Sequence, residues 1–333
     1  MVESNTRIDP VETAGAPHPP EGRSIGLHAL AAAVMYVSPL LLFVPAAFIS
    51  AGLRHGRKGI IGAVFGSAAI LLAVAAVFGG PGVSNEDFAG ILRMVLTVGL
   101  PAAIATDLIR RSVPFGRILV VALFVSLLGF FGAEALMRSG ASYSPYGAIL
   151  TEFRTASEPT IEFYRSMGMS QEQLDVMSRF SETLVSTFVP SVLIVITALM
   201  FLFSLVMLPR IPWGRETAPL LLFRTFALPD TMLFAFVLGG VSPLLSGLPR
   251  TIGLNVLVVV LFLYLVQGLA VFRAIVLRMK LGAVGSVAAW GLLGMMMLNG
   301  IGPFLLFLAG LFDPFFDFRK SRKKGDEDES DSD

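Results

Sequence analysis

The feature that most constrains this chain is a series of apolar blocks, most of them about 20 residues long, separated by short charged breaks. A helix needs about 20 consecutive apolar residues to cross the hydrocarbon core of a bilayer. Because lipid offers the backbone no hydrogen-bond partners, only helices and closed barrels cross it. These blocks are continuously apolar and do not alternate with polar residues, so helices are favoured. The blocks are residues 28–50, 59–78, 88–109, 118–137, 187–208, 231–245, 252–272 and 281–312.

The composition agrees with a membrane protein. Hydrophobic residues make up 55% of the chain and charged residues 15%, with a mean hydropathy of +0.77. Soluble domains have about 45–50% apolar and about 25% charged residues. We therefore predict an all-α fold, a polytopic transmembrane helix bundle of about eight to ten helical segments.

The first block leaves its path open. Pro39 and Pro45 interrupt residues 28–50, and proline breaks or kinks a helix. The block is therefore either one kinked span or a short helical hairpin.

The last block is too long for one upright span, since residues 281–312 would extend about 48 Å as a helix. Asn299 and Gly300 form a natural break within it. We expect two spans, at residues 283–299 and 303–318.

The loops between the blocks alternate in charge. Positively charged loops of membrane proteins stay in the cytoplasm. The acidic stretches at residues 86–87 and 138–185 are therefore expected outside, and the expected location is a bacterial inner (cytoplasmic) membrane, crossed several times. The basic loops lie at residues 54–58, 110–117, 210–224 and 273–280.

The two ends of the chain differ from its middle. Residues 1–24 are polar and rich in proline, which predicts a disordered N-terminal tail. Residues 25–318 form the predicted transmembrane helical domain. Residues 319–333 are basic and then acidic, which predicts a disordered C-terminal tail.

The external stretch at residues 138–185 is also patterned. Ser170 and Gln173 have the spacing of a capping box, which marks the start of a helix. Apolar residues then recur near the helical period, so we expect an external amphipathic helix lying on the outer surface of the bundle. A lid over a substrate site is the alternative. The recurring residues are Leu174, Met177, Phe180 and Leu184.

Several kinds of chemistry have no support in the sequence. The chain has no cysteine, and its three histidines lie at or beyond helix ends. No phosphate loop, zinc-protease motif or nucleophile elbow is present. The net charge of +1 gives no global field for nucleic acid. We expect no catalytic residues, no cofactor and no metal, so the chain is not expected to be an enzyme.

Polar groups at membrane depth are the strongest pointers to a site, because burying them is unfavourable. Tyr264, Gln267 and Gly268 share one helix face, whereas Asn255 lies about 180° from Tyr264. Our substrate-lining candidates are Asn255, Tyr264 and Gln267, with Tyr264 and Gln267 facing a cavity. Hydrogen bonding between helices is the alternative. The full set is Arg93, Asp107, Glu134, Asn255, Tyr264, Gln267, Asn299 and Asp313.

Three short motifs stand out in the second half of the chain. They are Leu228 with Pro229, Tyr264 with Gln267 and Gly268, and the closing run from Gly310 through Asp313 to Arg319 and Lys320. These motifs resemble the YybS-like (DUF2232) family of uncharacterised bacterial membrane proteins.

That family is distantly similar to the substrate-binding subunits of energy-coupling-factor transporters. Ala29 and Ala33 match the Ala-x-x-x-Ala with which those subunits dock a coupling subunit. The resemblance implies other membrane subunits with a separate ATPase as partners, alongside the lipid bilayer. It also favours the hairpin for residues 25–53, with Pro39 at the turn and the N-terminus in the cytoplasm.

Two functions from different classes remain open. The first is a transporter-like or substrate-capture subunit for an unknown small molecule, which predicts a closed polar cavity. The second is a structural or assembly protein of the cell envelope that binds a protein partner, which predicts a solid bundle. A membrane-embedded enzyme ranks third, because we find no cluster of acids or histidines at one depth.

Overall fold

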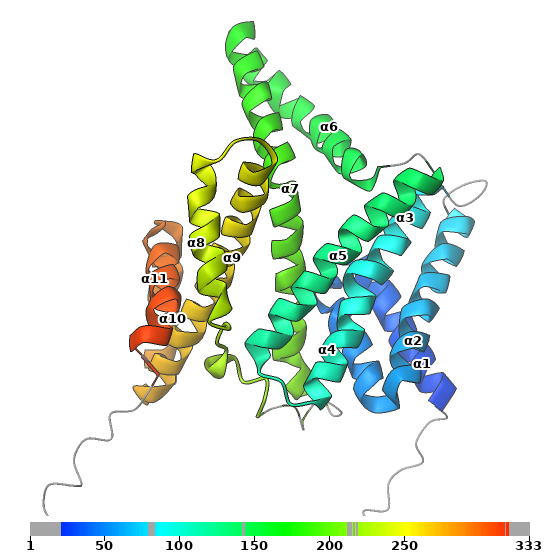
Figure 1. The fold of residues 1–333 in the computed structure, drawn as a ribbon, viewed down its shortest axis with the longest axis vertical. Coiled ribbons are helices and arrows are strands. Elements are labelled where there is room, and N and C mark those ends of the chain that lie inside the picture. The colour runs from blue at the N-terminus through cyan, green and yellow to red at the C-terminus, as the bar shows by residue number, and fades with distance from the viewer. Residues whose placement is uncertain are drawn as a thin grey trace, which may run out of the picture.

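The computed structural model describes most of the chain, and every regular element in the described part is helical (Figure 1). The described residues are 21–78, 84–141, 144–211, 215, 217, 219–316 and 318–319. The α-helices are α1 (Glu21–Tyr36), α2 (Val44–Phe78), α3 (Asn85–Met94), α4 (Leu100–Arg110), α5 (Phe115–Ala141), α6 (Pro145–Ser166), α7 (Gln171–Met207), α8 (Thr231–Val241), α9 (Gly247–Arg278), α10 (Ala283–Leu298) and α11 (Ile301–Phe316). The π-helical turn η2 (Val95–Gly99) joins α3 and α4 into one continuous helix. Counted in this way, the eleven α-helices of the described part form ten separate helices. The predicted all-α fold is confirmed.

Five of the described helical stretches are long and apolar enough to cross a bilayer. Each contains at least part of one predicted block, because apolar length is a local property of the sequence. The stretch after α7 holds the short 3-10 helices η3 (Leu208–Arg210) and η5 (Phe223–Thr225), and α8 continues into η6 (Ser242–Leu244). The five stretches are Pro39–Phe78, Asn85–Arg110, Phe115–Ser139, Gln171–Arg210 and Gly247–Arg278.

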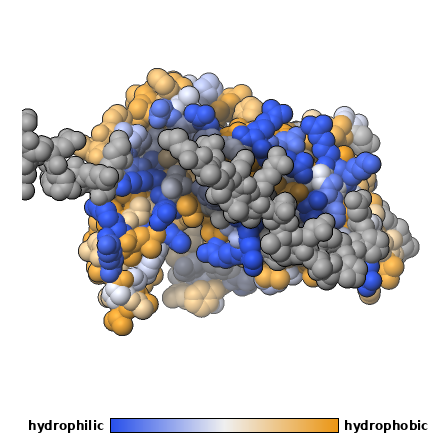
Figure 2. Space-filling model, turned by 90° about the horizontal axis from the view of Figure 1, so that it is seen from below, coloured by the Kyte–Doolittle hydropathy of each residue, from blue (hydrophilic) through white to orange (hydrophobic). Residues whose placement is uncertain are grey.

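The bundle has two distinct ends (Figure 1). We call the end with residues 54–58 and 110–117 the basic end, and the end from which α6 and the start of α7 project the hairpin end. Figure 2 looks onto the basic end and shows hydrophilic side chains gathered there among hydrophobic ones. The basic loops therefore share one end, as the charge alternation requires.

Helix α7 lies between α1–α5 on one side and α8–α11 on the other (Figure 1). The largest fully buried side chains include Phe48 of α2, Phe201 of α7 and Phe226 just before α8. All three belong to one hydrophobic core. The core is therefore continuous across α7 and ties the two halves together.

The first apolar block forms a hairpin. Helix α1 ends at Tyr36, Ser38 caps the 3-10 helix η1 (Pro39–Phe43), and α2 begins at Val44. The hydroxyl of Ser24, near the start of α1, lies 2.9 Å from Nε2 of His55, so the two arms begin and finish at the same end. The hairpin alternative is thus the one that the structure adopts.

Two boundaries of this region differ from the sequence-based expectation. Helix α1 begins at Glu21, four residues before the predicted boundary at residue 25, and residues 1–20 lie outside the described part. Helix α2 bends at Gly56, whose φ of 71° is one that residues with a Cβ rarely adopt. This bend separates the returning arm of the hairpin from the long segment that follows.

The last apolar block breaks where predicted. Helices α10 and α11 meet at Gly300, which has a φ of 72°, and their axes bend by 108°. Each has 16 residues and is about 24 Å long, which is less than the hydrocarbon core of about 30 Å. Nη1 of Arg319 donates to the carbonyl oxygen of Arg224 at 3.1 Å, so α11 returns to the basic end. The two expected full spans are therefore two shorter helices that enter the bundle and return.

The stretch predicted to be external, residues 138–185, is largely helical but does not lie along the bundle. The predicted capping box at Ser170 and Gln173 is present, and α7 then runs without interruption into its apolar segment. Helix α6 and the start of α7 extend beyond the bundle as a hairpin (Figure 1), with Arg154 paired to Glu182 between them. The polar residues of this stretch are mostly exposed.

Candidate functional site

A pocket of about 250 Å³ lies near the basic end, between α8, α9 and α11. We call it the C-terminal pocket. Tyr264 and Gln267 both line it, together with Asp230 at its rim. The remaining lining residues are Leu228, Pro229, Leu233, Leu311, Pro314 and Phe315.

Two glycines bring the walls of this pocket together. A Cβ at Gly268 would overlap the carbonyl oxygen of Leu306, and a Cβ at Gly310 would overlap that of Tyr264. The backbones of α9 and α11 therefore touch at this crossing, a packing that small residues make possible. This contact places Asp313 of α11 beside Gln267 of α9.

Gln267 is fully buried and its amide is paired at both ends. Its Oε1 accepts a hydrogen bond from the backbone N–H of Leu228 at 2.9 Å, and its Nε2 donates to Oδ2 of Asp313 at 3.2 Å. Buried amides are normally satisfied in this way. Gln267 therefore orders the wall of the pocket and joins three elements.

Arg319 completes this polar network. Its Nε donates to Oδ1 of Asp313 at 3.2 Å, and its Nη2 lies 2.7 Å from Oδ2 in an ion pair whose angle is not that of a hydrogen bond. The carboxylate of Asp313 thus has a cation and an amide donor as partners. This pairing explains how a buried acid is tolerated here.

Tyr264 is the polar group of the pocket that is left unpaired. Only 3% of its surface is exposed, and its ring packs edge-on against Phe236 and Phe307. No described residue forms a hydrogen bond with its hydroxyl, although the Asp230 carboxylate interacts with it electrostatically. The hydroxyl oxygen is not fully buried, so a hydrogen-bond partner from outside the chain can reach it.

Asn255 has a different role and lies outside the C-terminal pocket. Its Oδ1 accepts from the N–H of Ser191 at 2.9 Å, and its Nδ2 donates to the carbonyl of Thr187 at 2.7 Å. In a regular helix these two backbone groups of α7 bond to each other. Asn255 therefore bridges α9 to α7 beside Pro190.

A second side chain bonds a backbone group of α7 near Pro190. Pro190 has no N–H to offer the carbonyl of Ser186, and the hydroxyl of Tyr146 donates to that carbonyl at 2.6 Å. Burial, and then the nearby Glu134 carboxylate, raise the pKa of Tyr146, so the phenol stays protonated and able to donate. Side chains from α6 and α9 thus bond the backbone of α7 around Pro190.

The two alanines predicted to dock a partner are buried within the chain. Ala29 is 3% and Ala33 is 2% exposed. A Cβ at Gly66 would lie 2.9 Å from the Cβ of Ala29, so α1 packs closely against α2. In this structure the alanine pair serves packing between helices of the same chain.

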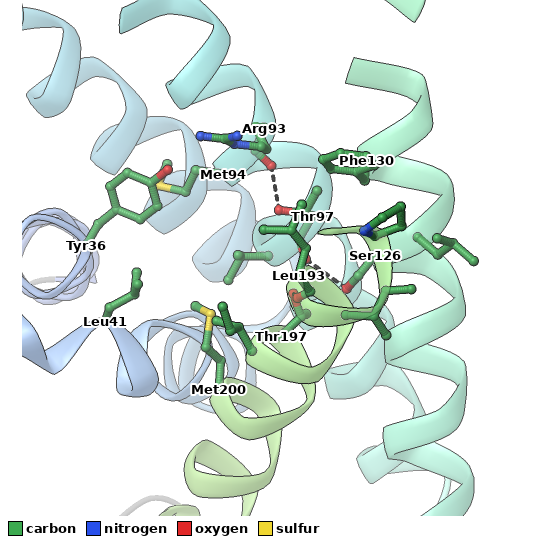
Figure 3. A pocket seen from close by; sticks show the side chains of 15 residues that line it. Tyr36, Leu41, Arg93, Met94, Thr97, Ser126, Phe130, Leu193, Thr197 and Met200 are labelled. Atoms are coloured by element: carbon green, nitrogen blue, oxygen red, sulfur yellow. Dashed lines mark hydrogen bonds between the residues drawn. The ribbon is translucent and has the colours of Figure 1, made fainter. Parts of the chain in front are cut away.

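A second pocket, of about 160 Å³, lies in the middle of the bundle (Figure 3). We call it the mid-bundle pocket. Its polar lining residues include Tyr36 and Arg93. The sequence marked Arg93 only by its membrane depth and did not mark Tyr36. No three His, Asp or Glu residues of the described part come together in a way that would hold a metal ion.

The apolar helical stretches and the buried polar contacts between helices define a polytopic helical membrane protein. The chain belongs to the family described as predicted membrane protein (DUF2232), whose family model matches residues 27–314. No curated protein and no solved structure matches the chain. The matched region contains the mid-bundle pocket and all of the C-terminal pocket except Phe315. The motifs around Leu228, Gln267 and Asp313 meet at the C-terminal pocket.

Proposed function

We propose that the chain is a non-enzymatic substrate-capture subunit of a transporter and binds a small molecule in the C-terminal pocket. The observation that carries this proposal is the hydroxyl of Tyr264, which has no hydrogen-bond partner among the described residues and belongs to a side chain in the wall of a cavity. A ligand that accepts or donates a hydrogen bond there would give the Tyr264 hydroxyl a partner that the described residues do not provide. The neighbouring Gln267 network would hold the wall rigid around it.

The proposed setting is a cytoplasmic membrane, with the basic end facing the cytoplasm. The sequence contains no phosphate-binding motif, so a separate ATPase subunit would supply any energy. Docking to such a subunit would use a surface other than Ala29 and Ala33, because both are buried.

A second candidate function is a structural or assembly protein of the envelope. It is favoured by the amides of Asn255 and Gln267, which are both committed to hydrogen bonds within the chain. This candidate leaves the C-terminal pocket without a ligand.

The test uses two variants that change the pocket in different ways. Tyr264→Phe removes the hydroxyl and keeps the ring, and Leu233→Trp fills the cavity. Tyr164→Phe, on α6 away from the pocket, is the matched control. Small molecules extracted from each purified protein would be compared by mass spectrometry. We expect a molecule that is present with the native protein and the control, and lost from both pocket variants.

The thermal unfolding midpoint separates loss of ligand from loss of fold. After exhaustive removal of small molecules, Tyr264→Phe should unfold no earlier than the native protein, because no hydrogen bond is broken. Identical extracts from all four proteins would remove the pocket as a ligand site and favour the assembly function.

A further inference from the structure

A positive charge lies inside a predicted span near the hairpin end. Arg93 of α3 is about 12 Å from the first residue of the Asn85–Arg110 helix. Its side chain is half-buried, and no carboxylate of a described residue lies within ion-pair distance of it. Charged residues at membrane depth are unfavourable unless paired or hydrated, and they mark ligand or ion pathways.

Arg93 is the residue that two pockets share. It lines the mid-bundle pocket and also a larger space of about 730 Å³ between α3 and α6, which we call the outer vestibule. The wall of the vestibule is part polar and part apolar, with Glu86, Thr151 and Glu152 among its lining residues. A molecule that moves from the hairpin end into the bundle through these spaces therefore passes the guanidinium.

The mid-bundle pocket offers one charge and little else that is polar. Arg93 is the only charged residue among those that line it. Hydroxyls in its wall already donate to backbone carbonyls: Thr97 to Arg93, Ser126 to Thr97 and Thr197 to Leu193, each at 2.8 Å. Figure 3 shows the Arg93 guanidinium extending toward Tyr36, whose hydroxyl donates to the carbonyl of Gly90.

The backbone at this position is irregular. Arg93 lies just before the π-helical turn η2, and Pro101 leaves the carbonyl of Thr97 without its helical donor. The hydroxyl of Ser126 donates to the Thr97 carbonyl instead, at an O···O distance of 2.8 Å. Turns of this kind are rare and often occur at functional sites.

We propose that Arg93 binds the carboxylate of a small molecule whose apolar body occupies the mid-bundle pocket. A guanidinium holds a carboxylate through two parallel hydrogen bonds. One cation balances one negative charge, and the rim carboxylates Glu86 and Glu152 disfavour more highly charged anions. A cavity of about 150 Å³ holds a benzene molecule, so a body of about that size fits here.

This site is separate from the C-terminal pocket, so its test does not depend on the proposed function. Benzoate is the probe, because it combines a carboxylate with a ring of the right size. Benzyl alcohol and benzylamine keep the ring and replace the negative charge by a neutral or a positive group. The thermal unfolding midpoint of the full chain in mild detergent would be measured against the concentration of each compound.

The variants separate charge recognition from packing. Arg93→Gln removes the charge, and Leu127→Trp fills the mid-bundle pocket and keeps Arg93. Arg117→Gln, an exposed arginine at the basic end, is the matched control for loss of charge.

We expect a saturable rise of the midpoint with benzoate for the native protein and for Arg117→Gln, and none with benzyl alcohol or benzylamine. Arg93→Gln and Leu127→Trp should each weaken the response at least about tenfold. Without ligand, Arg93→Gln should unfold no earlier than the native protein, since it removes a charge that no carboxylate of a described residue pairs and keeps a donor that can reach Tyr36. No saturable response to benzoate, or an equal response in Arg93→Gln, would overturn the proposal.

Discussion

Single polar side chains in this bundle complete the backbone of neighbouring helices. The hydroxyl of Ser204 accepts from the N–H of Ala46 and donates to the carbonyl of Leu42, each at 3.1 Å. The side-chain amides of Asn255 and Gln267 likewise form hydrogen bonds with backbone groups of other segments. Lipid offers the backbone no hydrogen-bond partners, so breaks in a helix require such replacements. In the described part, most polar candidates at membrane depth are therefore committed to contacts within the chain, and Tyr264 and Arg93 are the two for which we propose a ligand.

The two amides should differ in how much their loss destabilises the fold. Gln267→Leu leaves the Leu228 N–H and the Asp313 carboxylate without an amide partner, which should lower the free energy of unfolding by about 1–3 kcal/mol. Asn255→Leu should lower it by less, about 0.6 kcal/mol, because Ser191 and Thr187 are then able to bond each other within α7.

Chemical unfolding in mild detergent would measure both variants. Gln171→Leu is the surface control, since Gln171 is exposed and bonds only its neighbour Asp175. Its effect should stay within about 0.5 kcal/mol. An Asn255→Leu variant that is less stable than Gln267→Leu would contradict the assigned roles.

Pairs of helices are held at contacts that one side chain would break. Helices α9 and α11 touch at Gly268 and Gly310, and this contact sets the distance between two walls of the C-terminal pocket. The short helices α8, α10 and α11 depend on such packing, because none of them is long enough to cross a bilayer alone.

Adding one methyl group at this crossing should therefore be harmful. Gly310→Ala would force α11 away from α9 and should lower the free energy of unfolding by about 1–3 kcal/mol. Gly291→Ala on α10 is the control, because nothing lies within 4 Å of the added Cβ. Comparing their thermal midpoints tests the packing, and equal midpoints would mean that the helices do not meet at Gly310.

Helix positions were predictable from the sequence, and helix partners were not. The capping box at Ser170 and the break at Gly300 depend on residues next to each other in the chain, so local rules find them. Asn255 was grouped with Gln267 because both lie on one helix. Its partners Ser191 and Thr187 are 64 and 68 residues away. Pairing of this kind depends on how each helix is rotated, which periodicity alone does not determine.

The whole molecule has one basic end and one projecting hairpin, and this asymmetry predicts its orientation in the membrane. Because the chain has no cysteine, single cysteines report on position without interference. In intact cells an impermeant thiol reagent should label Ser166→Cys at the hairpin end and not Ser112→Cys at the basic end. Both native residues are exposed. Labelling at Ser112→Cys alone would show that the orientation is opposite to the predicted one. The outer vestibule would then open on the cytoplasmic side.

The larger hydrophobic core of the described part runs through both halves of the bundle, and pockets lie at two levels. Whether the C-terminal pocket carries a ligand separates a capture protein from an assembly protein. Native mass spectrometry of the full chain, released from lipid nanodiscs, measures this directly. We expect a fraction of the native protein to carry one small molecule above its mass of 35.6 kDa, and Leu233→Trp to carry none. Only bare protein and lipid adducts, the same for both proteins, would contradict ligand capture.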